Sequence, residues 1–490
     1  YEDKTHRSQR TIEVRCPAAI SDETAQRAQQ LALDAFNALG CLDCCRVDMR
    51  MDGDGQLSIL EVNSLPSLGE HGSYVAAAAA VGLDFAGLVN RLVEVASARY
   101  FGTPHPPQLP KGTADVPARI FGFLTQRRDE MESELRDWIH RPSRTQDPVG
   151  KERAVEELHR RLAGLGLRRR EDLTNERVAW TWETTRGLEG GTLFVGHLDV
   201  PVDLQAIHQG FRRDPEWLHG EGIGTSRAPL VCFESALRAL RHARRLRQLP
   251  LGVLYYLDEG ADCRYSAETI RRAAGLASRV LVLRPGGTGD TIITRRRGRS
   301  TYKLEIQGSP HRPGQRGKRV DVMQWASARF ADLAALTSSS DRLSVSVTHV
   351  HTYAYPMLLP HFVSATVLIT YRDPRAAARI EERMRSLLGR DGFSWRLNLV
   401  SARPAMGEGR ASLRLARDLV RTAEEWGIPI RKDSSLLPSA AGLVGSRIGA
   451  ICGIGPVARD LYTPQEAVLR LSLLQRALLL AQFLARESGG

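Results

Sequence analysis

Alternating apolar and polar residues predict a β-hairpin near the start of the chain. Residues 46–51 alternate, residues 57–63 alternate again, and the DGDG turn at 52–55 joins them. Residues 22–39 have helical spacing and precede this hairpin. Residues 102–117 are rich in proline and glycine and lack periodicity, so we expect a linker there. The first region of the chain therefore ends at this linker.

Beyond the linker, helices and short apolar strands alternate, which is typical of an α/β domain with a mostly parallel sheet. One long helix is expected over 118–139. A later group of strands has one exposed face, which predicts an α+β insert made of one sheet with two helices on a single face. The α/β pattern then returns and ends in a helix over 464–486. The predicted boundaries are 1–102 for the amino-terminal lobe, 103–117 for the linker, 118–298 and 408–490 for the α/β domain, and 299–407 for the insert.

The predicted hairpin brings oxygen-rich side chains to one face. Residues two apart in a strand share a face, so Asp48 is expected to face Glu61 and Asn63 across the ladder. Two carboxylates and an amide oxygen suit Mg²⁺, which takes one or two carboxylates and completes its shell with water and substrate phosphates. The alternative is a solvated hairpin that carries its charged residues outward, and spacing alone leaves both interpretations open.

Composition argues against a nucleic-acid partner. The chain carries a formal net charge of +12, but only six of its 68 basic residues are lysines. The arginines are scattered along predicted helices among Asp and Glu, and no basic stripe carries aromatic residues that would stack on bases. We therefore expect no nucleic-acid binding.

Cysteine content and hydropathy favour a cytoplasmic protein. Seven cysteines in a chain of this length indicate a reducing compartment. Cys41, Cys44 and Cys45 invite a zinc interpretation, but no second Cys or His pair follows at the required spacing, so we interpret them as packed thiols. No apolar run reaches the ~18–20 residues that span a bilayer, and no signal peptide is visible, so we expect no membrane association.

The hairpin and its flanks carry an ordered set of motifs. The strands contain RVD and LEVN, a CPA turn lies at 16–18, and apolar helices are expected at 74–99. Over about residues 1–100 the chain resembles the carboxyl-terminal part of D-alanine–D-alanine ligases, which are ATP-grasp enzymes. The resemblance implies a partial α+β ATP-grasp lobe and an ATP-dependent carboxylate–amine ligase. It implies ATP and Mg²⁺ as cofactors, with Mn²⁺ able to replace Mg²⁺, and an amino acid or dipeptide as substrate.

The resemblance also implies roles for individual residues. The acceptor pocket departs from the family, because the serine that usually holds the second substrate's carboxylate is Gly72, with Ser73 beside it. We therefore expect an acceptor other than D-alanine. The phosphate-binding and metal-binding positions are retained. They are Lys4, a phosphate-contacting lysine; Arg46, which steadies the phosphates and the tetrahedral intermediate; and the Mg²⁺ ligands Asp48, Glu61 and Asn63.

A second ordered set of motifs occupies the rest of the chain, over about residues 117–488. These motifs resemble those of the M20 family of zinc amidohydrolases and peptidases. The resemblance implies a doubly wound α/β domain interrupted by a ferredoxin-like lid and dimerisation insert, so a homodimer through 299–407 is expected. The motifs are FVGHLDVP at 194–201, GEGIGTSR at 220–227, LDEG at 257–260, GSPH at 308–311, and GIGP at 453–456 followed by LYTPQE at 461–466.

Most metal-ligand positions of that second family are altered. Its paired zinc ions need two histidines, a bridging Asp and two further carboxylates. Only His197 keeps a ligand, so we expect neither Zn²⁺ nor hydrolase activity. The other ligand positions hold Thr225, Gly260, Arg284 and Tyr462. Remnants of the site are Asp199 at the orienting position, Glu259 at the general-base position, and His311, a transition-state donor in active relatives that we expect to cap or pack its loop here.

Two functions from different classes remain open. In the first, the chain holds the metal-binding lobe of the ligase, and the M20-like region is a tethered, non-catalytic module that binds substrate or dimerises. In the second, the M20-like region is the working unit. It would then be either a zinc amidohydrolase or peptidase, or a binding module for N-acyl amino acids or peptides.

Overall fold

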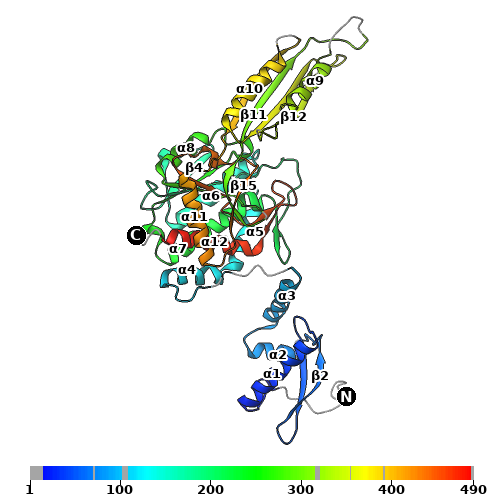
Figure 1. Ribbon diagram of the computed structural model, residues 1–490, viewed down its shortest axis with the longest axis vertical. Helices are drawn as coiled ribbons and strands as arrows, with labels where there is room; N and C mark the ends of the chain where they lie inside the picture. Colours follow the sequence, from blue (N-terminus) through cyan, green and yellow to red (C-terminus); the bar gives the residue numbers. More distant parts are fainter. Residues whose placement is uncertain are drawn as a thin grey trace. The chain divides into compact units, whose positions relative to one another are not determined.

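The computed structural model describes residues 15–69, 72–101, 107, 109–287, 289–314, 321–340, 342–353, 355–389 and 392–486. The chain divides into two compact units, Tyr1–Pro104 and His105–Gly490, each with its own buried core (Figure 1). Among the described residues, no single helix is both long and apolar enough to cross a bilayer. Ser73–Ala80 and Phe85–Val93, bent by 96°, match a span only as a pair.

The smaller unit contains the predicted hairpin, with strands that begin and end at the predicted residues. β1 (Arg46–Met51) and β2 (Leu57–Asn63) pair antiparallel. Asp52 stabilises the turn, because its Oδ1 accepts hydrogen bonds from the backbone N–H groups of Asp54 at 3.0 Å and Gln56 at 2.8 Å. The helices of this unit are α1 (Asp22–Ala38), α2 (Ser73–Ala80) and α3 (Phe85–Phe101).

The larger unit is built on an eight-stranded mixed sheet with the order β15-β10-β16-β9-β5-β8-β4-β3. The central strands β16, β9, β5 and β8 run parallel, whereas β4 is antiparallel to β8 and β10 is antiparallel to β16. β15 also pairs parallel with β10, so four of the seven pairings are parallel and the mostly parallel sheet that the sequence pattern predicted is confirmed. Its strands are β3 (Arg168–Arg169), β4 (Ala179–Glu183), β5 (Thr192–His197), β8 (Leu251–Tyr256), β9 (Arg279–Val282), β10 (Thr291–Arg296), β15 (Arg431–Ser435) and β16 (Gly449–Cys452).

Helices cover both faces of this sheet, as alternate side chains of β5 show. Phe194 belongs to a core with side chains of α7 and α12, whereas Leu193 and Val195 belong to a second core with side chains of α8. The predicted helix 118–139 is two helices, because Arg127 leaves the helical region at φ −111° and both halves then face the core. The helices are α4 (Asp115–Gln126), α5 (Arg128–Ile139), α6 (Pro148–Leu165), α7 (Ala228–His242), α8 (Ala267–Leu276), α11 (Arg410–Glu425) and α12 (Arg470–Ala485).

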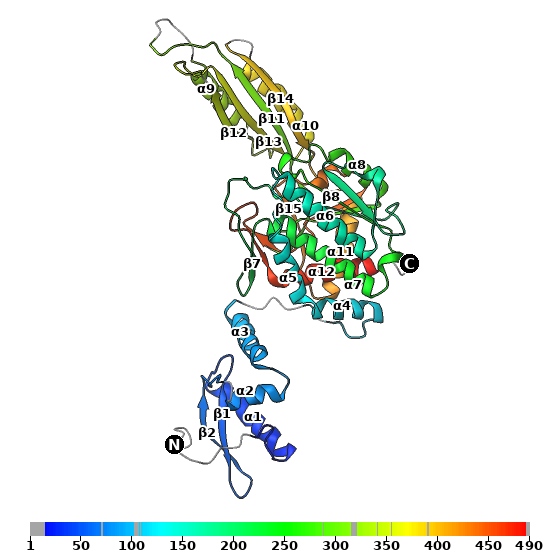
Figure 2. The ribbon, with the colours of Figure 1, turned by 180° about the vertical axis from the view of Figure 1, so that it is seen from behind.

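The insert is one four-stranded sheet with the order β12-β13-β11-β14 (Figure 2). Every second residue of β13 is buried, and four of these five residues share one core with side chains of α9 and α10. Both helices therefore cover a single face of the sheet, as predicted. The elements are β11 (Gly298–Gln307), α9 (Val322–Ala334), β12 (Ser344–Tyr353), β13 (Phe362–Tyr371), α10 (Pro374–Leu388) and β14 (Ser394–Arg403).

A small antiparallel sheet with the order β17-β18-β7-β6 lies beside the start of α12. The helix predicted over 464–486 begins only at Arg470, because Ala467–Leu469 form β18 and pair with β7. The strands are β6 (Arg212–Arg213), β7 (Trp217–His219), β17 (Ala458–Arg459) and β18 (Ala467–Leu469).

Candidate functional site

The hairpin of the smaller unit places the predicted metal ligands together. In the ladder Asp48 lies directly opposite Glu61, and Arg46 lies directly opposite Asn63. Because residues 46 and 48 share a face, as do residues 61 and 63, all four side chains lie on one face of the hairpin. The register shifts only beyond Asp48, at a bulge between Asp48 and Met49, so the site lies in the regular part of the ladder.

Arg46 pairs with the carboxylates of this face. Its Nε donates to Asp48 Oδ1 at 2.7 Å and its Nη2 donates to Oδ2 at 2.9 Å, a bidentate arrangement. The same Nη2 lies 3.7 Å from Glu61 Oε1. The hydrogen bonds to Asp48 raise the pKa of the Arg46 guanidinium. Asn63 Oδ1 accepts a hydrogen bond from the Leu65 backbone N–H at 3.0 Å, which orients the amide oxygen.

The donor set on this face fits Mg²⁺ by its chemistry. Asp48, Glu61 and Asn63 would supply two carboxylates and one amide oxygen, and the partial exposure of the side chains leaves room for water and phosphate ligands. Within the described residues, no group of three or more His, Cys, Asp or Glu side chains is arranged to hold a metal ion. The hairpin set therefore depends on its asparagine as a third ligand.

The predicted acceptor residues lie at the start of α2. Gly72 precedes the helix and Ser73 is its first residue. A Cβ on Gly72 would lie 3.0 Å from the carbonyl oxygen of Gly69, so a serine here would require the loop to shift. The departure from the ligase pattern at this position thus has a local packing reason. Lys4 lies outside the described residues, and the roles assigned to Lys4, Gly72 and Ser73 stay predictions.

In the larger unit, the residues at the M20-like motif positions converge at the end of β5. His197 ends that strand, is buried, and has its Nδ1 2.8 Å from the Asp199 carbonyl oxygen. The Asp199 carboxylate accepts hydrogen bonds from Thr145 Oγ1 at 2.7 Å and from the backbone N–H groups of Glu259 at 3.0 Å and Gly260 at 3.1 Å. His197 Nε2 is buried and has no hydrogen-bond partner among the described residues.

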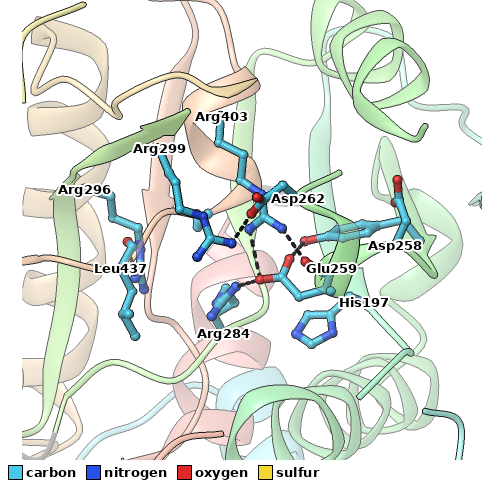
Figure 3. A network of polar contacts seen from close by, with 12 residues as sticks. His197, Asp258, Glu259, Asp262, Arg284, Arg296, Arg299, Arg403 and Leu437 are labelled. Atoms are coloured by element: carbon cyan, nitrogen blue, oxygen red, sulfur yellow. Dashed lines mark hydrogen bonds and ion pairs between the residues drawn. The ribbon is translucent and has the colours of Figure 1, made fainter. Parts of the chain in front are cut away.

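Glu259 is the centre of a buried ion-pair cluster (Figure 3). Its Oε1 accepts hydrogen bonds from Arg284 Nη1, from Arg403 Nη1 at 3.0 Å and from the Tyr462 hydroxyl at 3.4 Å. Its Oε2 accepts a hydrogen bond from the Tyr256 hydroxyl at 2.7 Å. Burial alone would raise the pKa of this carboxyl, but Arg403 and Arg284 outweigh burial and hold the pKa well below its usual range.

A second carboxylate extends the cluster to the insert. Asp262 pairs with Arg299, and its Oδ2 accepts hydrogen bonds from Thr301 Oγ1 at 3.0 Å and Ser401 Oγ at 3.1 Å. Arg299 and Thr301 belong to β11, whereas Ser401 and Arg403 belong to β14. Both stems of the insert are therefore tied to the turn at 259–262 that follows β8.

The positions that correspond to zinc ligands of the M20 family hold Thr225, Gly260, Arg284 and Tyr462. Arg284 and Tyr462 donate to Glu259 and contact each other. The Thr225 hydroxyl is buried and has no hydrogen-bond partner within the described residues. A Cβ on Gly260 would lie 2.5 Å from Thr145 Oγ1, so a second glutamate there has no room. These residues do not fit a pair of Zn²⁺ ions.

Sequence inspection did not identify every residue of this cluster. Arg403 and Asp262 are separated from the motifs, and Arg403 reaches Glu259 over 144 positions of sequence. The only available signal for Asp262 was its place three residues after Glu259. His311, which the motif singled out, lies in the loop after β11, where its carbonyl oxygen accepts a hydrogen bond from the Leu359 backbone N–H at 2.8 Å.

The two units are similar to different families of known proteins. Residues 1–94 match the family described as D-ala D-ala ligase C-terminus. Over this range the smaller unit is similar to that ligase family. A relative, the uncharacterized protein y4sG of Sinorhizobium fredii, is 41% identical over 87 residues, which are 18% of this chain and 26% of that protein. The chain thus spans about a quarter of this curated relative.

The larger unit has the fold of M20 peptidases. A tripeptidase from Staphylococcus aureus aligns with a TM-score of 0.58 at 13% identity, over 74% of this chain and 99% of that chain. An M20 metallo-carboxypeptidase from Sulfolobus solfataricus aligns with a TM-score of 0.54 at 14% identity, over 73% and 98%. A dinuclear metal-binding M20 peptidase from Bacillus subtilis aligns with a TM-score of 0.52 at 13% identity, over 75% and 98%. These likenesses show the fold.

Proposed function

We propose that this chain carries the metal-binding lobe of an ATP-dependent carboxylate–amine ligase. The observation that supports this proposal is the convergence of Asp48, Glu61 and Asn63 on one face of a hairpin that lies within the ligase-family match. ATP would phosphorylate the carboxylate of an amino acid, and the amine of a second amino acid or a dipeptide would attack the acyl phosphate. Bound Mg²⁺ would supply charge neutralisation for the phosphates.

The chain's own residues divide the remaining work. Asp48 and Glu61 would fix the cation, and Asn63 would complete the set with its amide oxygen. Arg46, on the same face, carries a guanidinium that can donate to the oxygen on which charge develops during attack. The acceptor would bind near the start of α2. Gly72 lacks the hydroxyl of the serine that usually holds the acceptor's carboxylate in the ligase family, so we propose an acceptor other than D-alanine.

Amino-acid-dependent release of ADP by the natural gene product tests this proposal. Glu61→Gln removes one predicted ligand charge, and we expect at least a ~100-fold fall in the rate of ADP release, as for other groups that act on transition-state charge. Asp54→Asn is the matched control, because it removes a carboxylate from the turn of the same hairpin without touching the predicted ligands. Equal rates for the two variants would refute the assignment.

The larger unit supports a second candidate, a non-catalytic module that binds N-acyl amino acids or peptides. Two buried polar groups, His197 Nε2 and Thr225 Oγ1, lack hydrogen-bond partners among the described residues, and buried polar groups are normally hydrogen-bonded, so we propose that a polar ligand supplies the missing partners. Calorimetric titration with a panel of dipeptides and N-acyl amino acids tests this candidate. Binding that is weakened by His197→Ala would support it, whereas zinc-dependent amide hydrolysis would contradict it.

A further inference from the structure

Arg46 lies where the predicted metal ligands meet. Its guanidinium donates to both oxygens of Asp48, at 2.7 and 2.9 Å, and lies 3.7 Å from Glu61. Asp48 and Glu61 are directly opposite each other in the ladder. One guanidinium therefore contacts both carboxylates that are proposed to share a cation.

The charges of this face explain the arrangement. Two carboxylates opposite each other repel, so the pair needs a positive group whether or not a metal is bound. Arg46 supplies that charge through a planar fork that matches one carboxylate and reaches toward the other. The fork occupies both oxygens of Asp48, so the guanidinium and a divalent cation compete for the same carboxylate.

We propose that Arg46 is an internal counter-ion of the metal site, which a divalent cation must displace from Asp48. The inference rests on the proposed ligase function and adds an order of events to it. Before the cation binds, the guanidinium is held by the ligands; once displaced, Arg46 is free to donate to phosphate or to the developing oxyanion. Cation binding therefore makes the arginine available at the moment when the site is complete.

The exposure of the ion pair makes displacement feasible. The side chains of Arg46 and Asp48 are 29% and 36% exposed, so water can solvate the guanidinium as it leaves. Ion pairs with this degree of exposure contribute little net stability, because solvent screens their attraction and two side chains must be held in one geometry. A divalent cation can therefore break the contact.

Mn²⁺ binding to the full chain, measured without nucleotide by the electron paramagnetic resonance signal of free Mn²⁺, tests the inference. Arg46→Met removes the competing charge, and we expect Mn²⁺ to bind about three- to tenfold more tightly than to the unaltered chain. Arg50→Met is the matched control, because Arg50 is an exposed cation of the same strand that makes no ion pair within the described residues. We expect it to leave the affinity unchanged within about twofold.

Asp48→Asn separates this inference from the proposed function. If Asp48→Asn weakens Mn²⁺ binding but Arg46→Met does not strengthen it, the metal site stands and the counter-ion role is wrong. If neither the unaltered chain nor the Arg46→Met variant binds Mn²⁺ in an Asp48-dependent way, the metal site and the inference both fall. Tighter binding by Arg46→Met and by Arg50→Met alike would reduce the effect to net charge and would also overturn the inference.

Discussion

Glu259→Gln is the most informative single perturbation of the larger unit. The side chain is 5% exposed and accepts hydrogen bonds from Arg284, Arg403, Tyr256 and Tyr462. Glutamine keeps the shape of the side chain but removes its charge. The buried guanidiniums of Arg284 and Arg403 then lose their shared counter-ion. The NH₂ group of the glutamine amide is also a hydrogen-bond donor, and it would face groups that are themselves donors. We therefore expect strong destabilisation.

Removing one partner of a buried ion pair costs roughly 3–5 kcal/mol, because the other charge stays buried and uncompensated. For a unit of this size, that loss corresponds to a fall in Tm of roughly 4–6 °C. Tryptophan fluorescence during thermal unfolding is a selective assay, since all seven tryptophans lie in the larger unit. The smaller unit therefore contributes no signal to the measured transition.

Glu268→Gln is the matched control for this experiment. Glu268 pairs with Arg271 at 3.5 Å, but their side chains are 74% and 48% exposed, so the expected loss is below about 0.5 kcal/mol. A double-mutant cycle with Arg284→Met then measures the coupling within the cluster, which should exceed ~1 kcal/mol. A loss of less than about 1 kcal/mol for Glu259→Gln would refute the view that this ion-pair cluster stabilises the larger unit.

Three further predictions concern the same unit. Burial raises the pKa of Glu234 to about 7, although Arg161 and Arg238 oppose the shift, so the folded state keeps a proton that the unfolded chain releases near pH 4. Raising the pH from 5 to 8 should therefore lower the free energy of unfolding by roughly 3 kcal/mol. Urea titrations of Glu234→Gln should show no such pH dependence. Gly260→Ala should destabilise the unit by about 1–3 kcal/mol in urea, because its Cβ would meet Thr145, whereas Gly275→Ala, with open space around it in α8, should stabilise by up to about 1 kcal/mol. EDTA should leave the thermal transition unchanged, and elemental analysis should find zinc well below one atom per chain. A transition lowered by EDTA would contradict the conclusion that the residues around Glu259 do not fit zinc.

Local signals in the sequence sufficed for the hairpin and the insert. The alternation of β1 and β2 and the turn between them are encoded within about 20 residues, so the strands and the facing of Asp48 and Glu61 could be predicted. The alternation of β13 likewise predicted an insert with helices on one face. The break between α4 and α5 escaped prediction, because Arg127 is neither proline nor glycine and only packing against the core bends the chain there.

The motif positions identified Thr225, Gly260, Arg284 and Tyr462 where the M20 family has zinc ligands, but not the contacts that these residues make. No local motif distinguishes Arg403 from the many other arginines of the chain. Its role depends on the fold, which places β14 beside the turn at 259–262. Such a contact has no local pattern, since it joins residues 144 positions apart. The competition of Arg46 for Asp48 was equally hidden, because spacing shows that residues share a face but not which side chains pair.

The tie between Asp262 and both stems of the insert has a mechanical consequence. A two-stem insert can swing only if the contacts at its base slide or break, and here that motion would separate Arg299 and Ser401 from a carboxylate they share. These contacts therefore oppose a swinging motion of the insert about its base. The outer edge strand of the insert is β12, which carries the 53% exposed side chain of Tyr353. Charge pairing at the turn after β8 thus acts on the direction in which this edge strand is presented.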